Sequence, residues 1–258
     1  MTWSRREFIV TSSVAVTAGT LGWSSLLGRA PSAAAALGSP QQPAPATPPP
    51  APPPAVPPAV PLFTSLRGNV GIFTARGGTI GWYVSPDAVL VVDSQFPDTA
   101  QMFLDGLKSR TQRRIDVLVN THHHGDHVGG NKVLRPAVVK IVAHENEPAL
   151  QRKQAAAAKS EDAQAYPDET FKDSWKVSLG GEVVSAKYYG PGHTSGDIAV
   201  FFERANVVHM GDLMFSTRHP RVDRPSGASI ANWITILEKV TGDHNADTVT
   251  LASDAAAD

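Results

Sequence analysis

From about Leu62 onward, short runs of β-branched and aromatic residues alternate with turn residues, and this pattern predicts a β-rich domain. Gly77-Gly78 and Ser85-Pro86-Asp87 separate the first runs as turns. Runs of this length bounded by Gly, Pro and Asp are typical of strands in an antiparallel meander. The predicted strands of this meander are 70–74, 79–84 and 88–92.

Two segments have the spacing of amphipathic helices. The first runs from Asp98, its predicted cap, to about Lys108, and the second opens at Ser229 and stops at Gly242. A polar, alanine-rich segment at 145–165 has good helix propensity. The predicted apolar faces are Met102, Phe103, Leu104 and Leu107 in the first helix, and Ile230, Trp233, Ile234, Leu237 and Val240 in the second.

The order of the elements predicts the architecture. Further strands are predicted at 115–119, 138–143, 170–171, 175–177, 183–189, 198–202, 206–209 and 248–251. Strands followed by a helix, and then strands followed by a helix again, indicate an α+β fold. In such a fold, two sheets pack face to face and the helices lie outside.

One stretch holds four histidines and an aspartate directly after the predicted strand 115–119. It reads Thr121-His122-His123-His124-Gly125-Asp126-His127. His122 and His124 lie two apart, so in extended backbone they point to the same side and can bind one metal ion. Asp126 and His127 can then face a second metal ion, because imidazole and carboxylate are common metal ligands. A surface histidine run or an expression tag would not explain the Gly-Asp insertion.

The pattern His-x-His-x-Asp-His after a buried strand resembles the signature of the metallo-β-lactamase fold superfamily. The resemblance covers 62–249 and implies that superfamily's four-layer αβ/βα sandwich. It implies a first metal on His122, His124 and His193, the last of these within Pro-Gly-His-Thr-Ser-Gly-Asp. It further implies a second metal on Asp126 and His127. Asp212, in His-Met-Gly-Asp-Leu, matches the carboxylate that bridges both metals in glyoxalase II-like members.

Other polar residues near these motifs have structural roles in this interpretation. Asp93, after four apolar residues, is either a hydrogen-bond acceptor that orients a ligand histidine or a turn residue before the helix. His123 is expected to point away from the metals, and Thr194 and Asp197 to brace their loop. The remaining histidines are expected in packing or surface positions: His144, His209, His219 and His244.

The resemblance implies a zinc hydrolase in which a metal-bound hydroxide attacks the carbonyl of an ester, thioester, lactone or lactam, with Asp126, His127 and Asp212 as catalytic groups. A true β-lactamase is one alternative. The bridging Asp212 fits the general hydrolases better, and the absence of cysteine excludes a thiolate ligand. A formal net charge of -1 argues against a nucleic-acid partner, so a small-molecule substrate is expected.

The carboxyl-terminal segment departs from the family pattern. Family members supply a last histidine to the second metal from a Gly-His pair after the final strand, whereas here 247–254 reads Asp-Thr-Val-Thr-Leu-Ala-Ser-Asp. His244 lies before that strand and would arrive at its wrong end. We therefore expect a truncated or replaced carboxyl terminus, one tightly bound zinc and a second, weaker divalent metal. The other alternative is a catalytically impaired metal- or ligand-binding protein.

The amino-terminal residues predict export. Arg5-Arg6 within Ser-Arg-Arg-Glu-Phe-Ile-Val resembles the twin-arginine motif of bacteria. We interpret 1–36 as a signal peptide, 37–61 as a Pro/Ala-rich linker and 62–258 as the hydrolase domain. The expected partner is the twin-arginine export machinery, and the expected location is periplasmic or secreted. The apolar stretch 8–27 is too weakly hydrophobic for a confident membrane span, although a retained anchor is an alternative.

Overall fold

The computed structural model describes residues 58–216 and 218–253. The predicted signal peptide and the predicted linker up to residue 57 lie outside the described residues. Within the described ranges, no helix combines the length and the apolar character that crossing a bilayer requires.

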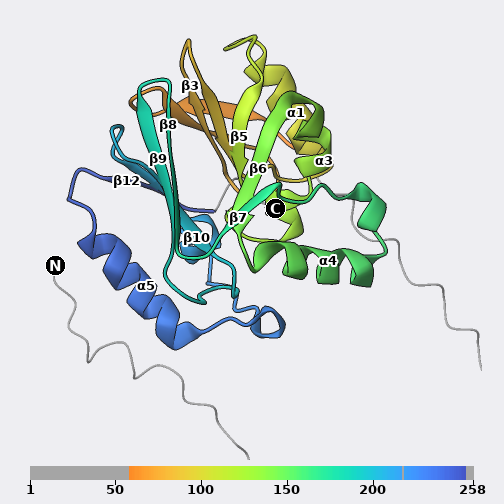
Figure 1. The fold of residues 1–258 in the computed structure, drawn as a ribbon, viewed down its shortest axis with the longest axis vertical. Helices are drawn as coiled ribbons and strands as arrows, with labels where there is room; N and C mark the ends of the chain where they lie inside the picture. The colour runs from red at the N-terminus through yellow and green to blue at the C-terminus, as the bar shows by residue number, and fades with distance from the viewer. Residues whose placement is uncertain (1–57, 217, 254–258) are drawn as a thin grey trace, which may run out of the picture. The chain divides into compact units, whose positions relative to one another are not determined.

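A seven-stranded mixed sheet forms the first half of the domain (Figure 1). The first four strands pair antiparallel, and the last four pair parallel. The second to fourth strands are the predicted meander, whereas the first has no counterpart among the predicted strands. Spatial order follows chain order: β1 (Leu62–Ser65), β2 (Val70–Thr74), β3 (Ile80–Val84), β4 (Val89–Val92), β5 (Ile115–Val119), β6 (Val138–His144) and β7 (Glu169–Phe171).

A five-stranded sheet forms the second half. Its strands run antiparallel except for the last pair, which is parallel. The strands are β8 (Ser174–Leu179), β9 (Glu182–Tyr188), β10 (Ile198–Phe202), β11 (Val207–His209) and β12 (Val249–Leu251), in spatial order β12-β11-β10-β9-β8.

Helices cover the outer faces of both sheets. The α-helices are α1 (Pro97–Leu107), α2 (Gly125–Val128), α3 (Asn131–Leu134), α4 (Glu147–Ala158) and α5 (Ile230–Gly242). The 3-10 helices are η1 (Arg135–Ala137), η2 (Glu161–Ala163), η3 (Gly211–Leu213) and η4 (Arg224–Ser226). In Figure 1, α1 and α3 lie on the seven-stranded side and α5 lies on the five-stranded side.

Three clusters of buried side chains confirm the predicted four layers. Leu90 and Val92 belong to the cluster between the sheets, where they meet residues such as Phe202. Val89 and Val91 point to the opposite face and pack in the cluster that includes Phe103 of α1. Both faces of β4 are therefore covered, which explains its unbroken apolar sequence. A third cluster packs α5 against the five-stranded sheet.

Three details of the predicted helices are wrong. Met102, assigned to the apolar face of α1, is exposed. Asp98 is not the cap of α1: the cap position is Phe96, and Asp98 lies in the first turn after Pro97. The buried face of α5 consists of Trp233, Ile236 and Val240. Three residues assigned to that face are instead exposed, namely Ile230, Ile234 and Leu237. Ser229 does cap α5, since its side chain accepts a hydrogen bond from the backbone N–H of Asn232.

Strand direction brings the motif loops to one edge of the sandwich. Since β4 and β5 are parallel, residue 93 and the histidine-rich loop both follow carboxyl ends on the same edge. The parallel pair β11 and β12 likewise places η3 beside the residues that follow Leu251. The loop between β9 and β10 completes this edge.

Candidate metal centre

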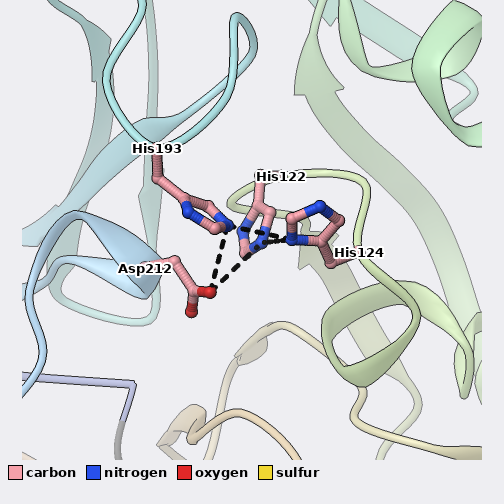
Figure 2. A group of neighbouring side chains, drawn as sticks. All are labelled: His122, His124, His193 and Asp212. Carbon is pink, nitrogen blue, oxygen red and sulfur yellow. Dashed lines mark hydrogen bonds and ion pairs between the residues drawn. The ribbon is translucent and has the colours of Figure 1, made fainter. Parts of the chain in front are cut away.

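Four side chains from three separate segments form a group that could hold a metal ion (Figure 2). His122 and His124 follow β5, His193 lies in the β9–β10 loop, and Asp212 lies in η3. Their ligand atoms all lie within 4.8 Å of one another. The Nδ1 atom of His124 lies 3.1 Å from Nε2 of His122 and 2.9 Å from Nε2 of His193. Asp212 Oδ2 lies 3.2 Å from Nε2 of His193.

The outward nitrogens of these rings have hydrogen-bond acceptors of their own. Nδ1 of His193 donates to the carbonyl oxygen of Arg221 at 2.6 Å. Nε2 of His124 donates to Asp223 Oδ2 at 2.8 Å. A neutral imidazole carries one N–H, so each outward N–H leaves a lone pair on the inward nitrogen. The two inward nitrogens of His124 and His193 therefore face each other as acceptors.

Thr121 orients the third ring, that of His122, in the same way, with a lone pair toward the group. Its hydroxyl lies 2.7 Å from Asp93 Oδ2, which can only accept, so the hydroxyl proton points to Asp93. The same hydroxyl oxygen lies 3.2 Å from Nδ1 of His122 and accepts from it. Nε2 of His122 then also carries a lone pair toward the group. Converging lone pairs repel one another unless a cation lies among them, so this donor set fits a metal ion.

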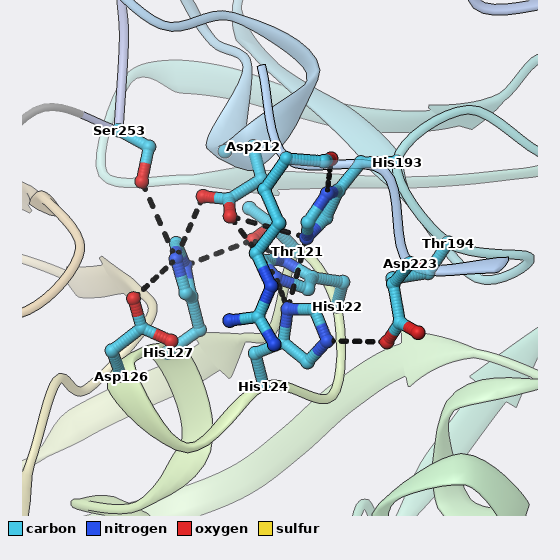
Figure 3. A network of polar contacts seen from close by, with 12 residues as sticks. Thr121, His122, His124, Asp126, His127, His193, Thr194, Asp212, Asp223 and Ser253 are labelled. Atoms are coloured by element: carbon cyan, nitrogen blue, oxygen red, sulfur yellow. Dashed lines mark hydrogen bonds and ion pairs between the residues drawn. The ribbon is translucent and has the colours of Figure 1, made fainter. Parts of the chain in front are cut away.

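A second position lies around Nε2 of His127 (Figure 3). His127 is fully buried in the first turns after the histidine run, in α2. Its Nδ1 lies 2.7 Å from Asp93 Oδ2, and its Nε2 lies 2.9 Å from Asp212 Oδ1 and 3.7 Å from Asp126 Oδ2. When the His127 ring is neutral, its single N–H points to Asp93, so the buried Oδ1 atom of Asp212 has no hydrogen-bond donor among the described residues. This pair of atoms also fits a cation.

Asp93 supports His127 and Thr121 together. Its carboxylate accepts from the backbone N–H and the hydroxyl of Thr121, both at 2.7 Å, as well as from His127. Asp93 is fully buried and has a φ of +64°, a conformation that is uncommon outside glycine and clusters at functional sites. Of the two interpretations of Asp93, the structure places it as the acceptor beside His127.

The titration behaviour of the two positions differs in direction. Burial, followed by the neighbouring histidines, lowers the pKa of His122 well below its usual value. Burial also lowers the pKa of His124, although the Asp223 carboxylate opposes this shift. Burial alone would lower the pKa of His127, but the carboxylates of Asp212, Asp126 and Asp93 raise it well above the usual value. Burial opposes ionisation of Asp212, yet His127 holds the pKa of that carboxyl below its usual range.

Two glycines allow the close approach of these groups. A Cβ on Gly78 would lie 2.4 Å from the ring of His127, so only glycine leaves space for that imidazole. Gly211, directly before Asp212, has a φ of +50°, and a Cβ there would lie 2.6 Å from the Thr121 hydroxyl. Backbone conformation and side-chain position are thus set together at this edge.

All six predicted metal ligands lie at this edge, and their ligation stays a prediction. His123 points elsewhere, with Nε2 3.3 Å from the Ser226 hydroxyl. Thr194 donates from its backbone N–H and its hydroxyl to Asp197, as expected for a braced loop. Of the other histidines, His144 stacks on Tyr188, His209 bonds the carbonyl oxygen of Thr79, and His219 is exposed. His244 packs beside Phe201.

Sequence reasoning missed two side chains of this site. Asp223 contacts His124 across 99 positions of the chain, so no local pattern connects them. Ser253 lies with its hydroxyl 3.4 Å from Nε2 of His127, at the place where a histidine was sought. The family pattern places a Gly-His pair after β12. In this chain the available signal for a further site residue was the polar residue two positions after Leu251. His123, His124 and Asp223 also form a second group with ligand atoms within 4.8 Å.

Comparison with known proteins agrees with this arrangement. The sequence profile of the Metallo-beta-lactamase superfamily matches residues 73–250. A metallo-beta-lactamase type 2 of Bacteroides fragilis is 22% identical over 187 residues, which cover 69% of this chain and 72% of that protein. A hydroxyacylglutathione hydrolase of Methylococcus capsulatus is 37% identical over 123 residues, or 46% of this chain and 41% of the relative. The chain thus matches less than half of that hydrolase.

Solved structures show the same fold. A metallo-beta-lactamase from Pontibacter korlensis superposes with a TM-score of 0.62 at 20% sequence identity, covering 75% of this chain and 91% of that one. The profile match spans well over half of the chain and includes every predicted metal ligand. The chain therefore belongs to the metallo-beta-lactamase superfamily.

Proposed function

We propose that this protein is a zinc-dependent hydrolase that cleaves esters, thioesters or lactones, with β-lactams as weaker substrates. One observation supports the metal centre most strongly. The outward N–H groups of His122, His124 and His193 are all hydrogen-bonded, so three nitrogen lone pairs converge on one point. A catalytic zinc position consists of three such protein ligands and an open position. Superfamily proteins of this kind bind zinc, which supports zinc as the first metal.

The position of Asp212 favours the general hydrolases over the true β-lactamases. One carboxylate oxygen lies 3.2 Å from Nε2 of His193, and the other lies 2.9 Å from Nε2 of His127. A carboxylate in this place can contact both metal positions, as expected from the glyoxalase II-like members. The similarity to the Methylococcus capsulatus hydrolase supports the same substrate classes, although it covers only part of that protein.

The residues around the site have different roles in the proposed hydrolysis. His122, His124 and His193 would hold the first metal, and Asp126, His127 and Asp212 the second. Bound there, zinc supplies Lewis-acid chemistry and activates water near neutral pH. Asp126 has the most exposed carboxylate of the group, with 37% of its side chain accessible, and can accept a proton from the solvent side. Asp212 is buried and serves to hold charge rather than to exchange protons with solvent.

A hydrolase panel on zinc-loaded protein tests this proposal. Thioesters, lactones, simple esters and β-lactams are compared at equal concentration, with His122→Ala as the inactive control. We expect cleavage of at least one of the first three classes that exceeds β-lactam cleavage and disappears in the variant. Equal, metal-independent rates for both proteins would contradict the proposal. Bound zinc without cleavage would instead favour a metal-binding protein, the second candidate, which the single nitrogen donor of the second position supports.

The amino terminus supports a proposal on location. We propose that the twin-arginine machinery exports the folded precursor to the periplasm. Replacing both Arg5 and Arg6 with lysine should retain the precursor in the cytoplasm, as fractionation would show. An unchanged periplasmic yield would contradict export by this route.

A further inference from the structure

We propose that the hydroxyl of Ser253 is a ligand group of the second metal position and that this oxygen-rich position accepts a hard divalent cation such as Mn²⁺. The inference rests on the proposed metal centre and concerns only its second position. Ser253 comes two residues after β12 and is 7% exposed. Its hydroxyl oxygen lies 3.4 Å from Nε2 of His127.

The peptide unit that precedes the Ser253 side chain is hydrogen-bonded through both of its polar groups. The backbone N–H of Ser253 donates to the carbonyl oxygen of Met214 at 3.1 Å. The preceding carbonyl, of Ala252, accepts from the Thr79 hydroxyl at 2.9 Å. Ser253 is thus held beside His127, one of the groups expected to bind the second metal.

The donor set around this point is one nitrogen and three oxygens. Nε2 of His127 has within 3.7 Å the carboxylate oxygens of Asp212 and Asp126 and the hydroxyl of Ser253. Because Nδ1 of His127 donates to Asp93, Nε2 can present its lone pair to a metal. Carboxylate and neutral oxygen donors suit Mg²⁺, Ca²⁺ and Mn²⁺, while imidazole-rich sets suit zinc. The second position should therefore prefer zinc over Mn²⁺ by a smaller margin than the first position, which has three imidazoles.

Replacement of Ser253 tests the assignment. Protein that carries zinc at the first position is titrated with Mn²⁺ and followed by electron paramagnetic resonance, and a parallel titration uses additional zinc. We expect Ser253→Ala to weaken Mn²⁺ binding by about tenfold or more, since the loss of a metal-supporting group typically has this size. Ser253→His should raise zinc affinity at the second position and lower the preference for Mn²⁺. Ser185→Ala, at another buried serine, is the matched control.

The outcomes separate this inference from the proposed function. Equal Mn²⁺ affinity in wild type and Ser253→Ala, or a wild type that binds no Mn²⁺ beside the first zinc, would overturn the role of Ser253. A Ser253→His variant with unchanged metal preference would also overturn it. Zinc-loaded protein that cleaves no substrate of the panel counts against the hydrolase proposal alone, because the Mn²⁺ titration does not depend on activity. Thermal unfolding of each variant reports whether the fold is intact.

Discussion

The two proposed metal positions share Asp212 but differ in the number of nitrogen donors and in how their ligands are supported. Each imidazole of the first position has its own acceptor: a backbone carbonyl for His193, a carboxylate for His124 and a hydroxyl for His122. The second position has one imidazole, His127, whose acceptor is the buried Asp93. The first position is thus oriented by three hydrogen bonds, one of which leads through Thr121 to Asp93, while the second depends on Asp93 alone.

The two positions also differ in how strongly protons compete with a metal ion for the histidine ligands. At the first, burial lowers the pKa values of His122 and His124, so those rings are ready to bind a metal at neutral pH. At the second, three carboxylates outweigh burial and raise the pKa of His127 well above its usual value. A metal must displace that proton. The added carboxylates supply negative charge for a bound cation. The same carboxylates also strengthen the binding of a proton to His127, and this proton competes with the metal.

The largest expected effect is the loss of the first metal. His122→Ala removes one of three converging nitrogens, and the remaining pair no longer forms a complete three-ligand zinc position. We expect purified wild-type protein to retain close to one tightly held zinc and the variant to retain almost none, measured by elemental analysis. His219→Ala, which removes an exposed histidine far from the motif in sequence, should keep the wild-type zinc content. A variant that keeps its zinc would show that His122 is not a ligand.

Much of the fold and of the candidate site could be predicted from the sequence. The motif 122–127 and the loop around His193 are local patterns, and the alternation of strands and helices indicates two sheets with outer helices, which the structure confirms. Contacts made by distant segments could not be predicted. Asp223 reaches His124 only because the chain after η3 folds back over the edge of the sheets, and hydrogen bonding of this kind has no periodicity.

The errors in α5 have a different physical origin. Its apolar residues exceed the number that one face can bury, because Ile230, Ile234, Leu237 and Ile236 surround much of the helix. Helical spacing alone therefore did not decide which of them meet the sheet. The sheet buries Ile236 together with Trp233, whose indole N–H donates to the carbonyl oxygen of Leu213 at 2.9 Å. That hydrogen bond, which depends on tertiary structure, sets the rotation of the helix.

The second largest effect concerns pH. Because the pKa of His127 is raised, its proton stays bound at neutral pH, and the affinity of the second metal should fall as the pH falls. Displacement of one proton predicts a loss that approaches about tenfold per pH unit below the raised pKa of His127. The lowered pKa values of His122 and His124 predict little change at the first position over this range. Titrations of both metals at several pH values check this difference, and equal slopes for the two positions would contradict it.

A smaller effect is expected from Asp93→Asn. Asparagine tolerates the positive φ of this residue, so the substitution tests the carboxylate rather than the backbone. It weakens the support of His127, and we expect about a 10–100-fold loss of affinity at the second position with the first zinc retained. The melting temperature should also fall, since buried donors of Thr121 and His127 lose acceptors. Asp87→Asn, at an exposed aspartate, controls for the change in charge. Loss of the first zinc instead would show that Asp93 supports both positions through Thr121.

The smallest effect is expected from Asp223→Asn, which should weaken the first position as Asp93→Asn weakens the second. Asp223 is the acceptor for His124 Nε2 at 2.8 Å, and its carboxyl has a pKa held at about 2, mainly by hydrogen bonds from Ser226 and His124 against the effect of burial. The asparagine carbonyl can still accept one of these bonds, and His122 and His193 keep their own acceptors. We therefore expect a loss of about tenfold at the first position, the lower end for such support, and no change at the second. Competition with a zinc chelator measures the first affinity, and Asp243→Asn, at an aspartate that pairs with Lys187, is the control. If Asp223→Asn weakened the second metal rather than the first, the two positions would be coupled through Asp212, and the independence of their supports would be wrong.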